Sequence, residues 1–108
     1  MDTLLRTLAD DNRRTVLEEL RTRPATVNEL ARKLPIARPG VSRHLRVLRE
    51  AGLVEVRHDA QRRIYSLRPE PLADLDAWLA PYRALWNERM TALHDEIARG
   101  KSEGRNTP

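Results

Sequence analysis

One stretch, residues 37–67, constrains the fold more than any other part of this 108-residue chain, because several structural signals follow one another in it. It reads ARPGVSRHLRVLREAGLVEVRHDAQRRIYSL and opens near a proline, which suits the first turn of a helix. The apolar positions then repeat at the spacing of one buried helix face, at Val41, Leu45 and Leu48. Gly52 stands where a left-handed C-terminal cap belongs, so the sequence predicts a helix over about residues 38–51.

The second half of this stretch predicts a β-hairpin. Residues 53–57 and 64–67 are short β-type runs, and the charged segment HDAQRR, residues 58–63, separates them. Neither an Asn-Gly nor an Asp-Gly pair marks the turn, so its type stays open. We expect a charged, mobile hairpin tip directly after the arginine-rich helix.

Three amphipathic segments precede the stretch. The first carries Leu4, Leu5 and Leu8, and the second follows a break at Asp10-Asp11 and carries Val16, Leu17 and Leu20. The third opens on TVNE, a capping box with Thr26 as N-cap, and ends at Pro35. A short helix joined near Pro35 to the longer one matches the helix-turn-helix pattern. The predicted fold is mainly α (α+β): a winged helix-turn-helix with about five or six helices and a two-stranded β-hairpin wing.

A longer apolar repeat follows the hairpin, and its steps of three and four residues resemble a coiled-coil seam. Its positions are Leu72, Leu75, Leu79, Tyr82, Trp86, Leu93 and Ile97. Pro81 interrupts the repeat, because an interior proline removes a helix hydrogen bond, and both a kinked helix and two separate helices stay open. Residues 100–108 have no apolar side chain. We therefore expect one domain over residues 1–99 and a disordered tail over residues 100–108.

Positive charge is concentrated before this last repeat. Residues 1–68 hold 15 Lys and Arg against 9 Asp and Glu, whereas residues 69–108 hold 5 against 7. Within residues 38–63, seven arginines stand against three acidic residues. A basic part beside a mildly acidic part is typical of a nucleic-acid reader with a separate assembly surface. The plainer alternative is that these charges only solvate helix faces.

The outward face of the 38–51 helix and the wing, about residues 57–63, are the predicted contacts to double-stranded DNA. One α-helix fits the major groove, and a basic hairpin beside it can reach phosphates or the minor groove. The candidates are Arg38, Pro39, Ser42, Arg43, His44 and Arg46 on the helix, and Arg57, Arg62 and Arg63 on the wing. His44 lies between the buried and exposed faces, so a phosphate contact and packing beside the core both stay open. Arg13 and Arg14 are expected to serve local packing or a dimer contact instead of base reading.

Four motifs, in their order along the chain, resemble the ArsR/SmtB family of bacterial winged-helix repressors. They are LADDNRRTVLEEL, TVNELARKL, VSRHLRVLREAGLV and RRIYSL, and the resemblance covers about residues 3–98. The later segment PEPLADLDAWLAPYRALWNERMTAL resembles the metal-independent branch of that family. The resemblance implies a homodimer that binds an inverted-repeat operator and represses transcription. We expect a cytoplasmic protein, because the sequence has no cysteine, no apolar run long enough for a membrane span and no signal peptide at its start.

The same resemblance implies dimerisation through the first and last helices. The candidate interface residues are Leu4, Leu5, Leu8, Leu75, Trp78, Leu79, Tyr82, Trp86 and Leu93. The chain departs from the family pattern at Asp11-Asn12, which replaces a usual Pro-Thr pair, and in a wing that lacks its frequent glycine. Ala37 also stands where a serine N-cap is common, and Pro81 interrupts a helix that is usually continuous.

Other classes of function find little support in the sequence. The chain has no cysteine, and the positions of the Cys-x-Cys motif of metal-sensing family members are here Thr26 and Asn28. A single His94 beside Asp95 and Glu96 is a poor zinc site, so we expect no metal and no other cofactor. No catalytic motif is present, so an enzyme is not expected. No apolar run approaches the ~18–20 residues of a membrane span, and the first residues do not begin a signal peptide.

Two further hypotheses remain beside the repressor. The winged helix could be a protein-interaction module without DNA affinity, although the basic stripe on helix and wing argues against this. The regulator could also respond to a small organic or lipid-like effector between the terminal helices, in a pocket lined by Trp78, Tyr82 and Trp86. Aromatic residues at helical spacing are more often part of a core or an interface.

Overall fold

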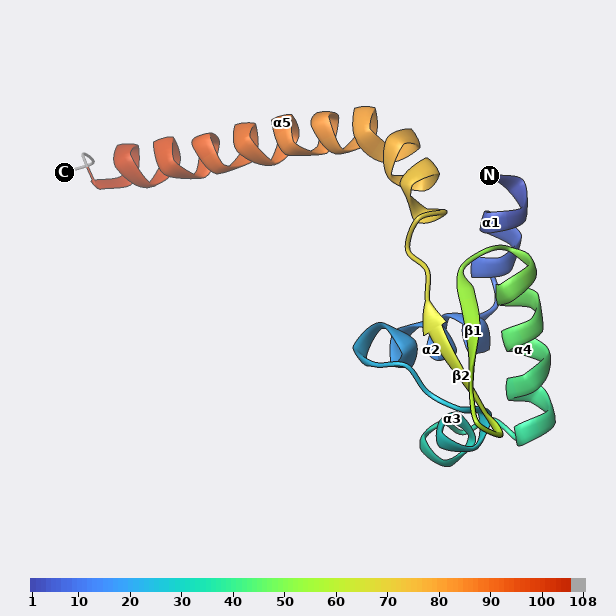
Figure 1. Ribbon diagram of the computed structural model, residues 1–108. Coiled ribbons are helices and arrows are strands. Elements are labelled where there is room, and N and C mark those ends of the chain that lie inside the picture. The colour runs from blue at the N-terminus through green and yellow to red at the C-terminus, as the bar shows by residue number, and fades with distance from the viewer. Residues whose placement is uncertain (106–108) are drawn as a thin grey trace. The chain divides into compact units, whose positions relative to one another are not determined.

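The computed structural model describes the backbone of residues 1–105 and the side chains of residues 1–100. Its elements are α1 (Asp2–Leu8), α2 (Asp11–Thr22), α3 (Val27–Lys33), α4 (Arg38–Glu50), β1 (Val54–Asp59), β2 (Arg62–Leu67) and α5 (Leu72–Arg105) (Figure 1). These helices and the antiparallel hairpin confirm the predicted winged helix-turn-helix class. The chain divides into two compact units with the boundary between Leu75 and Asp76.

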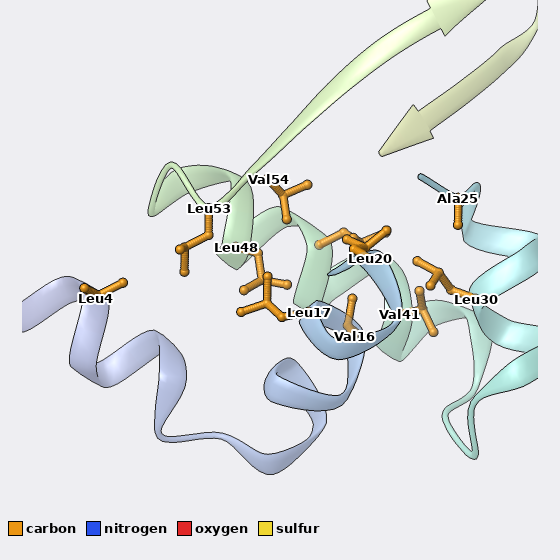
Figure 2. Packing of buried hydrophobic residues seen from close by; sticks show 11 residues of the cluster. Leu4, Val16, Leu17, Leu20, Ala25, Leu30, Val41, Leu48, Leu53 and Val54 are labelled. Carbon is orange, nitrogen blue, oxygen red and sulfur yellow. The ribbon is translucent and has the colours of Figure 1, made fainter. Parts of the chain in front are cut away.

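The core of the first unit is formed by the apolar faces of α2, α3 and α4, closed by α1 and by the first residues of the hairpin. Figure 2 shows these side chains, which belong to Leu4, Val16, Leu17, Leu20, Ala25, Leu30, Val41, Leu45, Leu48, Leu53 and Val54. The predicted buried positions of the second and fourth helices all lie in this core. Because α4 is fixed along its whole inner face, its outer face has a defined orientation.

Both ends of the helix-turn-helix segment are set by local sequence. In the capping box of α3, the Glu29 backbone N–H donates to the Thr26 hydroxyl at 3.2 Å, and the Thr26 N–H donates to the Glu29 carboxylate at 3.1 Å. At the end of α4, Gly52 has a φ of 78°. The N–H of Leu53 bonds the Leu48 carbonyl at 3.0 Å, and that of Gly52 bonds the Arg49 carbonyl at 3.0 Å. This is a Schellman motif, which confirms the predicted glycine stop.

The start of α4 lacks the corresponding cap. Ala37 is the N-cap residue and makes no side-chain hydrogen bond to the first turn. We expect Ala37→Ser to raise the free energy of unfolding by ~1 kcal/mol, because a serine hydroxyl can accept one of the free N–H groups of that turn. Urea unfolding followed by circular dichroism measures the change. Ala37→Val, which offers no acceptor, is the control, and equal stability of the two variants would contradict the prediction.

The wing is longer and tighter than the sequence indicated. The strands pair from Val54 with Leu67 to Asp59 with Arg62, so the turn contains only Ala60 and Gln61 instead of residues 58–63. Ala60 has a φ of 55°, which glycine adopts more readily, and it occupies the turn of a wing that lacks glycine. An extended residue, Ala25, also joins the hairpin: its N–H and carbonyl bond the carbonyl and N–H of Tyr65 at 3.0 and 2.8 Å. The wing is thereby attached to the segment that leads into α3.

Helix α1 is attached to α2 through main-chain carbonyls. The Arg13 Nε donates to the Thr7 carbonyl at 2.7 Å, and its Nη2 donates to the Arg6 carbonyl at 3.3 Å. The Arg14 Nη1 donates to the Leu8 carbonyl at 2.6 Å. These are the last carbonyls of α1, where the regular helix hydrogen bonds end; of the three, the Arg6 carbonyl also accepts from the Ala9 N–H at 3.3 Å. Both arginines therefore serve local packing, one of the two roles expected for them.

Helix α5 runs without interruption through Pro81, so of the two alternatives for this region the structure has a single helix. The Arg83 guanidinium donates to the Asp76 carboxylate at 2.7 Å, which joins the turns on either side of the proline. The helix continues to Arg105, beyond the predicted start of a disordered tail at residue 100. The remainder of that predicted tail, residues 106–108, lies outside the described residues.

Candidate nucleic-acid interface

The outward face of α4 carries the predicted helix contacts. Arg38, Pro39, Ser42, Arg43 and Arg46 are exposed, while Val41, Leu45 and Leu48 on the same helix are buried. Among the described residues, none of the arginines on this face forms an ion pair with an acidic side chain of the chain. Their guanidinium groups are therefore available for an external anion.

His44 does not lie on this outward face. It is only 6% exposed, and its Nδ1 is buried without a hydrogen-bond partner among the described protein atoms. Its position agrees with packing beside the core, the second of the two alternatives, and does not support a place among the DNA contacts. The helical period alone put it at the boundary between the faces, and the neighbouring elements cover it.

The wing presents its predicted residues in two different settings. Arg57 is exposed on β1, opposite Ile64, and Arg63 is exposed on β2, opposite His58. The Arg62 Nη2 lies 3.4 Å from the Glu29 Oε1, which joins the wing to the first turn of α3. The Thr26 N–H and hydroxyl, together with the nearby Arg62, lower the pKa of the Glu29 carboxyl below its ordinary value. Glu29 is thus held as a carboxylate beside Arg62.

Two grooves lie on the basic surface that α3, α4 and the wing form. The first, of about 580 Å³, lies between the start of α3 and the wing, and it includes Arg32, Arg38, Arg62 and Arg63. The second, of about 440 Å³, lies between α4 and β2, and it includes Arg38, Ser42, Arg46, Arg49 and Arg63. Arg38 and Arg63 line both grooves, so the two are contiguous. Of the predicted contacts, Arg38, Ser42, Arg46, Arg62 and Arg63 are brought together in these grooves. Pro39 and Arg43 line a separate hollow with Ser42 and Arg46, and Arg57 lines neither groove.

Two arginines of these grooves, Arg32 and Arg49, were not among the residues singled out from the sequence. Arg49 follows Arg46 by three residues, so the arginine repeat of α4 contains the signal for it. Arg32 lies on α3, and nothing in the local sequence indicates that the wing approaches that helix.

The residues predicted for the dimer interface divide between the core of the chain and its surface. Leu4 is 6% exposed and belongs to the core of its own chain, which does not support its place in an interface; Leu8 is partly buried against the same core. Leu5 of α1, by contrast, is 46% exposed. On α5, Leu75 packs against the core of the first unit and Leu79 is partly buried. The large exposed apolar residues of that helix are Trp78, Tyr82, Leu85, Trp86, Met90, Leu93 and Ile97.

No cluster of three or more potential metal ligands occurs among the residues described by the structure. Within the same residues, no helix is both long and apolar enough to cross a membrane.

This geometry defines a class of protein: a winged helix-turn-helix with an exposed basic helix face and a basic wing. Comparison with known proteins agrees. A family model described as a helix-turn-helix domain matches residues 8–57. The HTH-type transcriptional regulator Rv2034 of Mycobacterium tuberculosis is 43% identical over 100 residues, covering 93% of this chain and 88% of the relative. The transcriptional repressor SdpR of Bacillus subtilis is 28% identical over 79 residues, covering 73% of this chain and 88% of that protein.

Solved structures give the same assignment. The ArsR family transcriptional regulator RHA00566 has a TM-score of 0.68 at 34% identity, covering 80% of this chain and 94% of that one. A homodimeric winged helix-turn-helix domain of Mb0332 from Mycobacterium bovis has a TM-score of 0.62 at 25% identity, covering 77% of each chain. The chain belongs to the ArsR family of winged helix-turn-helix, DNA-binding transcriptional regulators, as the sequence motifs indicated.

Proposed function

We propose that the chain is a homodimeric repressor that binds an inverted-repeat operator. The observation that carries this proposal is the continuous basic surface of α4 and the wing, on which exposed arginines line two contiguous grooves. Arg38, Pro39, Ser42, Arg43 and Arg46 enter the major groove and read base edges, because arginine pairs with guanine through two hydrogen bonds. Arg57, Arg62 and Arg63 contact phosphates or the adjacent minor groove.

The dimer forms through exposed apolar residues of α1 and α5. Leu5 on α1, and Trp78, Tyr82, Trp86 and Leu93 on α5, are 46–64% exposed, and large exposed apolar side chains that gather on a helix mark an interaction site. The homodimeric domain of Mb0332, a relative of similar fold, supports this assembly. Two copies related by a two-fold axis place their recognition helices about 34–36 Å apart, one turn of DNA.

The repressor acts without sensing a metal. Thr26 and Asn28 supply no thiolate at the positions used by metal-sensing relatives, and His94 is exposed on α5 with no second histidine on that helix. A small organic or lipid-like effector bound beside Trp78 and Tyr82 is the second candidate mode of control. Their exposed rings, with centroids 4.9 Å apart and planes tilted by 37°, offer an aromatic surface for such a ligand.

Titration against DNA from the protein's own promoter region, at two salt concentrations and with non-specific competitor, tests the proposed function. We expect a competitor-resistant complex that weakens at higher salt and protects a two-fold-symmetric site, because arginine contacts release counterions from the phosphates. A complex lost equally to any competitor DNA would instead favour the interaction-module hypothesis. Adding a panel of apolar ligands to the complex would test the effector.

A further inference from the structure

Arginines from α3, α4 and the wing line the two contiguous grooves of the basic surface. Arg32, Arg38 and Arg63 line the groove between α3 and the wing, and Arg38, Arg49 and Arg63 line the groove between α4 and β2. We call these four residues, Arg32, Arg38, Arg49 and Arg63, the arginine track. Two of its members, Arg38 and Arg63, are shared by both grooves, so the track passes from α3 across the wing to the last turn of α4.

The charge of the track is not neutralised by the chain itself. Among the described residues, none of its four arginines lies within ion-pair distance of a carboxylate. Glu29 is the acidic residue in the linings of the two grooves, and it pairs with Arg62, which is not in the track. A line of exposed guanidinium groups without internal partners attracts an extended polyanion.

The position of Arg49 on α4 favours a contact to a DNA phosphate over a contact to a base. Arg49 lies in the last turn of α4, whereas base reading by a recognition helix is done mainly from its N-terminal residues. It faces the same groove as Ser42 and Arg46, one turn further along the helix. Arg32 lies in the last turn of the other helix of the motif, α3. Both residues therefore lie beside the base-reading part of the surface, where a DNA backbone runs.

We propose that Arg32 and Arg49, in the parts of the arginine track on either side of the wing, contact DNA phosphates, while Arg38 between them reaches base edges. This inference rests on the proposed function and adds two binding residues to it. Phosphate contacts fix the register of the protein on the duplex and carry no base information. The two residues therefore contribute to affinity for any DNA sequence and little to discrimination between sequences.

The test is a salt titration of operator and non-specific DNA with the full-length variants Arg32→Gln and Arg49→Gln. Each substitution removes one phosphate contact per protomer, so we expect the slope of log affinity against log salt to flatten by about 1.8 per dimer. Affinity at low salt should fall on the order of tenfold for both DNAs, and Arg49→Lys should restore most of it, since lysine also binds phosphate.

Arg21→Gln is the matched control. Arg21 is an exposed arginine in the last turn of α2, lines neither groove, and its loss changes the net charge by the same amount. If Arg32→Gln and Arg49→Gln show the same slope of log affinity against log salt as this control, the proposed phosphate contacts are wrong, but the proposed repressor function is unaffected. A loss confined to operator DNA would also overturn the proposed phosphate contacts, because Arg49 would then read bases. Failure of the unmodified protein to form a competitor-resistant complex would overturn the proposed function, and the track with it. Thermal unfolding of each variant confirms that the fold is intact.

Discussion

Replacing Arg43 and Arg46 together with alanine is expected to weaken operator binding by ~2–6 kcal/mol per protomer, since a bidentate arginine–base contact contributes about 1–3 kcal/mol. Binding to non-specific DNA should fall less, because most of its affinity comes from phosphate contacts. Both side chains are exposed on the outer face of α4, so the core is unaffected. Fluorescence titration of labelled operator and of a scrambled duplex measures the two affinities.

The control for this pair is Arg21→Ala with Arg68→Ala. Both are exposed arginines in surface ion pairs, Arg21 with Glu18 and Arg68 with Glu55 and Glu70, and they line neither groove. The control removes the same charge from the chain. Equal losses of affinity on operator and scrambled DNA would assign Arg43 and Arg46 to phosphates, and base reading would then need other residues.

Changing Trp78 and Trp86 together to lysine is expected to separate the dimer and to lower operator affinity by roughly 10²–10⁴-fold. The apolar face of α5 is unfavourable in water unless a partner covers it, and two charges placed on it cannot be buried without partners. Once the protomers separate, the second half-site no longer benefits from the high effective concentration that a dimer provides. Sedimentation velocity gives the oligomeric state, and operator titration gives the affinity.

Thr91→Lys adds a charge to α5 away from this face and is the matched control. Thr91 follows Trp86 by five residues, which places it about 140° around the helix, and it is exposed. The variant should remain dimeric with unchanged operator affinity. A double tryptophan variant that sediments as a dimer would show that the protomers associate through another surface.

Features that depend on neighbours along the chain could be predicted from the sequence. The buried face of α4, the capping box of Thr26 and Glu29, and the glycine stop at Gly52 are each set within about one or two helical turns. The family motifs lie in these same segments, and for this reason the fold class and the family could both be predicted correctly from the sequence.

Features that depend on distant segments could not be predicted. The pairing of Ala25 with Tyr65 and the ion pair of Glu29 with Arg62 join residues separated by most of the helix-turn-helix motif. Leu4 and Leu5 are adjacent leucines in the sequence, yet one is 6% and the other 46% exposed, because the helices packed against α1 decide which is covered. His44 on α4 is likewise buried because neighbouring elements of the fold cover it. Arg32 is part of the basic surface because the wing lies beside α3, and that contact joins distant parts of the chain.

The attachment of α1 to α2 has a consequence for how such regulators diverge. Arg13 and Arg14 hold α1 by its main-chain carbonyls, and main-chain carbonyls are present whatever the side chains are. Substitutions at exposed positions of α1, such as Leu5, can therefore accumulate without detaching the helix. After gene duplication, two copies could acquire incompatible α1 surfaces while each keeps its fold. Such a chain can become unable to pair with its paralogue before its recognition helix has changed at all.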